Sequence, residues 1–191
     1  RPLLRRMLSG ISLIGAQTEL DAERLKAFGA NPDRVTVTGN LKFDQATSVM
    51  PPPRIELRRQ LGLSDDARVF IAGCPRPVRE ERAVLDACIA VHAAHPDVTI
   101  IWAPRHLARL DDVERMLDGA DLAWLRRSAL NETADKHAPV ILLDTMGELA
   151  TLYGAADVAF VGATLVPLGG HNLLEPASHG VPVVFGPNTQ N

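Results

Sequence analysis

From residue 67 onward, short apolar runs rich in β-branched residues alternate with longer segments whose apolar residues recur at helical spacing. "ARVFIAG" at 67–73 is followed by a helical pattern at 78–95, and "VTIIWAP" at 98–104 by another at 107–119. Buried strands that alternate with helices are typical of a parallel sheet covered on both faces. The pattern therefore predicts an α/β fold for this part of the chain.

The same alternation continues toward the end of the sequence. Further strands are predicted at 122–128, 138–144, 157–163 and 182–185, and further helices at 146–156 and 172–180. We find no internal repeat and no low-complexity segment in the chain.

The first 50 residues form a separate, shorter series. It comprises a strand at 9–17, a helix at 19–30 that Thr18 caps and Gly29 ends, and a strand at 33–40. The stretch 45–57 contains three consecutive prolines, Pro51 to Pro53, which favour extended structure and predict a linker. We therefore place a domain boundary between residues 50 and 51.

Composition narrows the functional class. The chain has 191 residues, a net charge of -3 and 46% apolar residues, which suffices for one domain and part of another and offers no case for nucleic-acid binding. No apolar run approaches the length of a membrane span, and no signal peptide precedes the first strand. Cys74 and Cys88 fit a reducing cytosol. Because the chain starts at Arg1 and stops just after a turn, we expect a fragment of a longer protein.

Polar or glycine-rich loops follow four of the predicted strands. They are "GCPRP", "APRH", "DTMGE" and "GATLVPLGGHNLLE". In a parallel sheet, the carboxyl ends of the strands share one edge, and ligands bind there. The four loops therefore predict one composite binding site.

The last of these loops carries the densest cluster. Gly169 and Gly170 allow positive φ and close backbone approach, and His171 follows them. A helix predicted to start near Asn172 would attract a phosphate, and Glu175 would suit the hydroxyls of a ribose. A simple turn followed by a first-turn charge explains the same residues, so both interpretations stay open at this point.

The other loops add candidates with equally plain alternatives. Arg105 offers a planar fork for phosphate, next to His106, but could be a surface residue that caps a strand end. Gly147 and Glu148 open a helix, where capping by Asp144 or Thr145 is the alternative. In "TGNLKFD", Lys42 lies near the expected cleft between domains or is a solvated hinge lysine. No pair of histidines has metal-ligand spacing, and there is no P-loop and no nucleophile elbow.

Taken together, "VTGNLKFD", "APRH" and the segment 144–187 resemble the 3-deoxy-D-manno-octulosonic acid (Kdo) transferase family, over essentially the whole chain. The resemblance implies a GT-B-type, Rossmann-like fold and a fragment of a two-domain enzyme. Residues 1–50 would be the tail of the N-terminal acceptor-binding domain with the hinge. Residues 51–191 would be the C-terminal CMP-Kdo-binding domain, truncated at its C-terminus. The implied activity is transfer of Kdo from CMP-Kdo to a lipid A precursor, lipid IVA, in lipopolysaccharide core biosynthesis, although we expect the fragment alone to be inactive and to bind CMP weakly or not at all.

The resemblance also assigns roles to individual residues. It places Lys42 in transition-state stabilisation, and it puts the catalytic base outside this chain. Its CMP contacts correspond to Pro104, Arg105, Met146, Gly147, Glu148, Asn172, Leu173, Leu174 and Glu175, with Gly169, Gly170 and His171 as further candidates and no metal or cofactor. The chain departs from the family where Cys74, Pro75 and Arg76 replace the usual Ser-Thr-His, and where Leu173 replaces a common Pro.

The implied partners are the CMP-Kdo donor, the lipid A precursor and a membrane surface, with no nucleic acid. We expect the whole protein at the cytoplasmic face of the inner membrane, where Arg1, Arg5 and Arg6 would face anionic headgroups or simply be a solvated helix end. Two alternatives remain open: another GT-B enzyme, such as a UDP-sugar transferase or epimerase, and a non-enzymatic, partner-binding fragment.

Overall fold

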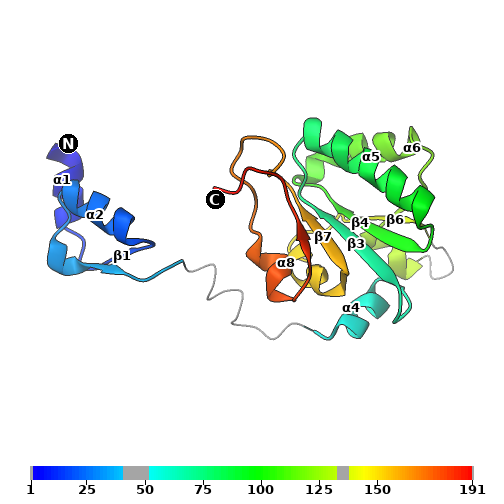
Figure 1. Ribbon diagram of the computed structural model, residues 1–191, viewed down its shortest axis with the longest axis horizontal. Coiled ribbons are helices and arrows are strands. Elements are labelled where there is room, and N and C mark those ends of the chain that lie inside the picture. The colour runs from blue at the N-terminus through cyan, green and yellow to red at the C-terminus, as the bar shows by residue number, and fades with distance from the viewer. Residues whose placement is uncertain (1, 41–51, 133–137, 191) are drawn as a thin grey trace. The chain divides into compact units, whose positions relative to one another are not determined.

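A computed structural model describes residues 2–40, 52–132 and 138–190, which form parts of two compact units, Arg1–Val49 and Met50–Asn191 (Figure 1). Each unit has its own sheet. Lys42 and Pro51 lie outside the described residues. None of the described helices is long and apolar enough to cross a membrane.

The smaller unit contains a two-stranded parallel sheet and two short helices. Its elements are α1 (Pro2–Ser9), β1 (Ile14–Ala16), α2 (Glu19–Ala27), the 3-10 turn η1 (Pro32–Arg34) and β2 (Val35–Val37). The predicted caps of α2 are confirmed: the Thr18 hydroxyl accepts the Asp21 N–H at 3.1 Å, and Gly29 has φ +103°. The sequence pattern did not predict α1, because it has no polar cap and buries none of its residues.

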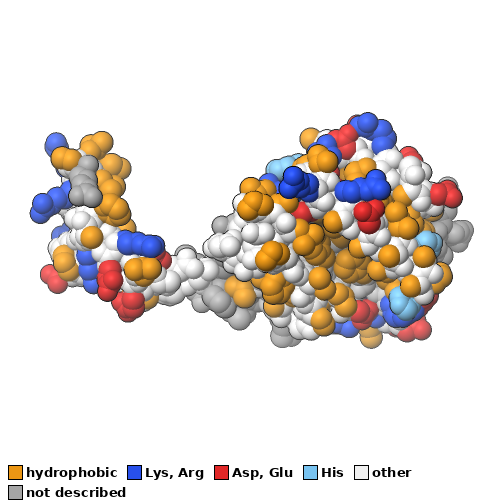
Figure 2. Space-filling view, turned by 45° about the horizontal axis from the view of Figure 1, so that its top comes forward, with side chains coloured by type: hydrophobic (Ala, Val, Ile, Leu, Met, Phe, Trp, Pro, Cys, Tyr) orange, Lys and Arg blue, Asp and Glu red, His pale blue; other side chains and the backbone are white. Residues whose placement is uncertain are grey.

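The surface of the smaller unit carries several large apolar side chains (Figure 2). Leu3, Met7 and Leu13 are 73%, 63% and 70% exposed, and Leu20 and Phe28 are about half exposed. With two short helices and two three-residue strands, the unit has too few elements to cover these side chains.

The larger unit alternates strands and helices as predicted, with some differences in extent. Its elements are α4 (Arg54–Gln60), β3 (Arg68–Gly73), α5 (Arg79–Ala94), β4 (Val98–Ala103), η2 (Leu107–Arg109), α6 (Leu110–Asp118), β5 (Trp124–Arg126), η3 (Arg127–Glu132), β6 (Val140–Leu142), α7 (Leu149–Leu152), η4 (Tyr153–Ala155), β7 (Val158–Val161), α8 (Leu174–Ser178) and β8 (Val183–Val184).

Three differences concern where a helix begins, and two of them have a clear local cause. The predicted linker is wrong from residue 54 on, because α4 begins directly after Pro53, whose fixed φ suits a helix start. The helix predicted at 146–156 begins only at Leu149, since Gly147 has φ +84°. The helix predicted at 172–180 begins at Leu174.

The six strands of the larger unit form one parallel sheet in the order β5-β6-β4-β3-β7-β8, which confirms the predicted fold class. From β3 the chain adds β4, then β5 at the edge and β6 between β5 and β4, and it then returns to the other side of β3 with β7. Parallel sheets bind ligands where the strand order reverses in this way, beyond the carboxyl ends of the strands. In this sheet, that point lies between β3 and β7.

The core has two layers, one on each face of the sheet. Ile71 and Ile101 pack on the face covered by α4 and α7, whereas Ala72 and Trp102 pack on the face covered by α5 and α6 (Figure 1). Adjacent strand residues thus enter different layers, as the period of a strand requires. Cys88 of α5 is fully buried, and burial raises the pKa of its thiol to about 12.

At the edge of the sheet opposite the predicted site, Arg58 of α4 joins several segments. Its side chain is buried; Nε donates to the Ala155 carbonyl at 3.2 Å, Nη1 to the Asp65 carbonyl at 2.8 Å, and Nη2 to the Asp157 carboxylate at 2.9 Å. The same carboxylate accepts the Val69 N–H at 2.8 Å. Arg58 therefore holds α4 against the starts of β3 and β7.

We expect Arg58→Ala to lower the free energy of unfolding by about 2–4 kcal/mol, because it removes three hydrogen bonds and leaves buried acceptors unpaired. Arg82→Ala is the control: Arg82 pairs with Asp86 at 3.1 Å on the solvent face of α5, where an ion pair contributes at most about 1 kcal/mol. Urea denaturation of both variants measures the difference. Equal losses would show that Arg58 has no special role.

Candidate active site

The predicted loops all lie at the carboxyl edge of the parallel sheet. Cys74 follows β3, Pro104 follows β4, Leu143 follows β6 and Gly162 follows β7. Because β3 and β7 are neighbours, the first and last of these loops meet at the point where the strand order reverses.

Gly162 lets the loops after β3 and β7 touch. A Cβ atom on Gly162 would lie 2.1 Å from the Cys74 carbonyl oxygen, a distance that no side chain allows. Cys74 itself has φ +53°, which turns the chain sharply at the end of β3. No local sequence signal marks Gly162, and only its position directly after a buried strand distinguishes it.

Glu80, in the first turn of α5, holds the same two loops together. Its side chain is completely buried, and its carboxylate accepts N–H groups from Arg76 at 2.7 Å, Ala163 at 2.6 Å and Leu165 at 2.7 Å. Sequence reasoning missed this residue, because an acidic residue in a first helical turn normally interacts with the helix dipole at the surface. Here it fixes the backbone on both sides of the site.

The glycine pair adopts the predicted backbone conformation. Gly169 and Gly170 have φ +83° and +81°, and Gly170 donates its N–H to the Ala163 carbonyl at 2.9 Å. A Cβ atom on Gly170 would also come within 2.9 Å of the Asn188 carbonyl. The next residue, His171, donates its N–H to the Gly162 carbonyl at 3.1 Å. The loop therefore folds back on the end of β7 and brings His171 to the Cys74 side.

Asn172 and Glu175 interact with each other and with the start of α8. The Asn172 side-chain oxygen accepts the Leu174 N–H at 3.1 Å, and its amide donates to the Glu175 carboxylate at 3.3 Å. The prediction that a helix begins near Asn172 is therefore corrected: α8 begins at Leu174 and has five residues. A helix this short has a weak dipole, so charge at the site comes mainly from side chains.

The charged side chains converge on Cys74 and His171. Burial, together with the smaller effects of the nearby guanidinium groups of Arg105 and Arg76, lowers the pKa of His171 to about 4. Burial also raises the pKa of the Cys74 thiol, against the opposing effect of Arg105, which lies within hydrogen-bonding reach. Two arginines from different loops therefore face a neutral imidazole and a neutral thiol at pH 7.

Glu175 lies near the same group. Tyr153 is buried with its hydroxyl against Gly73, and burial, with smaller contributions from Cys74 and Glu175, raises the pKa of that hydroxyl. Glu175 also raises the pKa of the Cys74 thiol. The structure thus brings together Arg105, His171 and Glu175, three predicted residues that are distant in the sequence.

The loop after β6 is the next one along the same edge. It lies beside the loop after β4, which contains Pro104 and Arg105. Met146 is 78% exposed, and Gly147 has open space around its Cα. The Glu148 carboxylate accepts the Thr145 hydroxyl at 2.7 Å and lies 3.4 Å from Arg127 Nε. Asp144 does not cap α7 as the alternative interpretation supposed, because its carboxylate accepts the Ser128 N–H at 2.9 Å.

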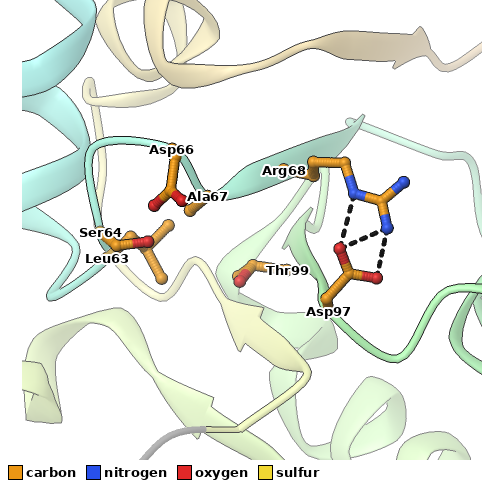
Figure 3. A pocket seen from close by; sticks show the side chains of 7 residues that line it. All are labelled: Leu63, Ser64, Asp66, Ala67, Arg68, Asp97 and Thr99. Atoms are coloured by element: carbon orange, nitrogen blue, oxygen red, sulfur yellow. Dashed lines mark hydrogen bonds and ion pairs between the residues drawn. The ribbon is translucent and has the colours of Figure 1, made fainter.

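The pocket in Figure 3 lies elsewhere, at the amino ends of β3 and β4. Its lining residues are Leu63, Ser64, Asp66, Ala67, Arg68, Asp97 and Thr99. Arg68 and Asp97 in it form an ion pair with each other. Within the described ranges, no group of three or more His, Cys, Asp or Glu residues is arranged to hold a metal ion.

We expect Glu80→Gln to lower the free energy of unfolding by about 2–3 kcal/mol, because an amide can accept on only one side and would turn its NH2 toward a buried N–H donor. Asp86→Asn, the same kind of change on an exposed part of α5, should alter stability by less than about 0.5 kcal/mol. Chemical denaturation measures both. If Glu80→Gln left the free energy of unfolding unchanged, the two loops would hold their positions without the carboxylate.

The chain is similar to known proteins over nearly its whole length. Residues 1–45 match the family model described as 3-Deoxy-D-manno-octulosonic-acid transferase (kdotransferase). The 3-deoxy-D-manno-octulosonic acid transferase of Bordetella pertussis is 40% identical over 192 residues, which cover 98% of this chain and 43% of that protein. The chain spans between 29% and 43% of the length of the curated relatives it matches most strongly.

Two solved structures are similar to the fold. The C-terminal CMP-Kdo binding domain of WaaA from Acinetobacter baumannii has a TM-score of 0.59 and 34% identity, over 72% of this chain and 70% of that one. Anabaena Alr3699/HepE, solved in complex with UDP-glucose, has a TM-score of 0.52 over 98% of this chain and 49% of that one. At 17% identity, the second match shows the fold alone, which is that of the GT-B glycosyltransferases.

Proposed function

Because the chain belongs to the 3-deoxy-D-manno-octulosonic acid transferase family, we propose that it forms part of a glycosyltransferase that moves Kdo from CMP-Kdo to a lipid A precursor. The observation that carries this proposal is the 34% identity to a CMP-Kdo binding domain over 72% of this chain. The larger unit would bind the donor, and the smaller unit would belong to the acceptor-binding domain.

In the proposed donor complex, each loop at the carboxyl edge has a task. Arg105 binds the phosphate of CMP, since a guanidinium matches its oxygens and stabilises the charge on the leaving group. Gly169 and Gly170 let the backbone approach the nucleotide, and Glu175 accepts the ribose hydroxyls. The remaining proposed CMP contacts are Pro104, Met146, Gly147, Glu148, Asn172, Leu173 and Leu174.

The catalytic step would use groups beyond these loops. A base outside this chain removes the proton from an acceptor hydroxyl, which attacks the anomeric carbon of Kdo while CMP leaves. Lys42, by its resemblance to the family, would stabilise the transition state. The chain's own contribution is to bind the donor, orient it and stabilise the leaving phosphate.

We also propose that the whole protein works at the cytoplasmic face of the inner membrane, with a lipid A precursor as acceptor. A lipid acceptor and a soluble nucleotide donor must meet at such a surface. Arg5 and Arg6 on α1, next to the exposed Leu3 and Met7, suit a surface with anionic headgroups.

The competing function is that of a UDP-sugar enzyme with the same fold. In a transferase of full family length that contains this chain, we expect CMP to inhibit Kdo transfer at least about tenfold more strongly than UDP, because the site is proposed to recognise a cytidine monophosphate. Inhibition constants for both nucleotides measure the preference. Stronger inhibition by UDP would favour the competing function.

We expect Glu175→Gln in the same enzyme to reduce kcat/KM for CMP-Kdo by at least about tenfold, because hydrogen bonds to a charged acceptor are each worth about 1.5–3 kcal/mol. Folding should change little, because a first-turn charge contributes only about 0.3–1 kcal/mol to its helix. Glu56→Gln, in the first turn of α4 and exposed, is the matched control and should leave the kinetics unchanged. Normal turnover of Glu175→Gln would rule out the ribose assignment.

A further inference from the structure

We propose that Arg76, together with His171, binds the carboxylate end of the sugar in the donor and so selects a sugar acid over a neutral sugar. This inference rests on the proposed function, since it concerns the sugar part of the same donor site. Arg76 stands in the Cys74-Pro75-Arg76 segment, where this chain departs from the usual sequence of the family it resembles. The family therefore suggests no role for Arg76, and this chain's own geometry carries the inference.

The backbone of Arg76 is held firmly at the point where the strand order reverses. Its N–H donates to the buried Glu80 carboxylate at 2.7 Å, and that carboxylate also accepts from Ala163 and Leu165 of the loop after β7. The Cβ of Arg76 therefore starts from a defined position between the two loops. A guanidinium attached there is oriented in advance for a ligand at the carboxyl edge.

The side chain of Arg76 has unused hydrogen-bonding capacity. Its Nε is buried and has no hydrogen-bond partner, and the described residues contain no ion pair with Arg76. The Nε2 atom of His171 is likewise buried and unpartnered. Buried polar atoms are rarely left unpaired, so two of them in neighbouring loops indicate a polar ligand.

Arg76 and Arg105 both lie near enough to His171 to act on its charge. Both guanidinium groups lower the pKa of His171. The backbone of Cys74 hydrogen-bonds the His171 ring, which leaves Nε2 of the neutral imidazole as an acceptor for a hydroxyl. The group thus offers two cationic forks for anions and one acceptor for a sugar hydroxyl.

The chemistry of the proposed donor matches this set. Kdo is a ketose acid, so its anomeric carbon carries both the phosphate of CMP and the carboxylate. The two anions are separated by only a few bonds, and each fits one guanidinium in a bidentate arrangement. With Arg105 on the phosphate, Arg76 is free for the carboxylate through Nε and one Nη, and His171 for a hydroxyl. A neutral hexose would leave Arg76 without a partner, which disfavours its binding.

The test uses a full-length transferase that contains this chain, with CMP-Kdo and CMP as the two probes. CMP has the nucleotide and phosphate but no carboxylate. We expect Arg76→Gln to raise KM for CMP-Kdo by at least about tenfold and to change the inhibition constant of CMP by less than about threefold. Arg76→Lys should fall between the wild type and Arg76→Gln, because an ammonium group keeps the charge and loses the planar fork.

Arg79→Gln is the control, because Arg79 is an exposed arginine at the start of α5, three residues after Arg76, and it should match the wild type with both probes. Melting temperatures of all variants should agree within about 2 °C, since the Arg76 side chain makes none of the hydrogen bonds of the fold described here. Equal losses with CMP and CMP-Kdo would assign Arg76 to the phosphate and overturn the inference, as would unchanged kinetics. A wild-type enzyme that CMP does not inhibit would instead overturn the proposed function.

Discussion

The buried carboxylate of Glu80 is the interaction on which the arrangement of the site depends. It accepts three backbone N–H groups at 2.6 to 2.7 Å, one from the loop after β3 and two from the loop after β7. A completely buried carboxylate is stable only when such partners replace its water shell. The hydrogen bonds that offset the desolvation of the Glu80 carboxylate therefore also fix the spacing of the two loops.

The other constraints at this edge act in the same direction. Gly162 permits contact with the Cys74 carbonyl that any side chain would prevent, and the buried Thr164 accepts the Gly186 N–H at 2.9 Å, which holds the segment after β8. The parallel sheet below supplies a common direction for all of these loops. The result is a preorganised backbone from which Arg76, Arg105 and Glu175 extend, as the proposed donor binding would require.

The opposite edge of the sheet has a different character. Its polar groups are mostly paired among themselves, as in the Arg58–Asp157 and Arg68–Asp97 ion pairs. At the carboxyl edge, by contrast, Arg76 and Arg105 have no carboxylate partner among the ion pairs described. The buried Nε of Arg76 and Nε2 of His171 have no hydrogen-bond partner. Paired charges stabilise the fold, whereas unpaired ones provide binding capacity, and this difference separates the two edges more clearly than the presence of a pocket.

Much of this molecule follows from local sequence. The period of the apolar residues determined the strands and helices of the larger unit, and hence a parallel sheet whose polar loops share one edge. Residues with a local signature were found in the same way: the positive φ of Gly169 and Gly170, and the cap formed by Thr18. The start of α7 was predicted too early, because Gly147 adopts a positive φ that a helix does not allow, although its neighbours favour a helix.

Only the tertiary structure decided which of these residues meet. In the sequence, Glu80 looks like a surface charge. It becomes the buried acceptor of two loops because β7 returns to lie beside β3, although β4, β5 and β6 come between these two strands in the chain. Arg76 gains its position from the same contact. The sequence determined what each loop contains, since that depends on neighbouring residues, whereas the order of strands in the sheet determined which loops face each other, since that depends on contacts between distant parts of the chain.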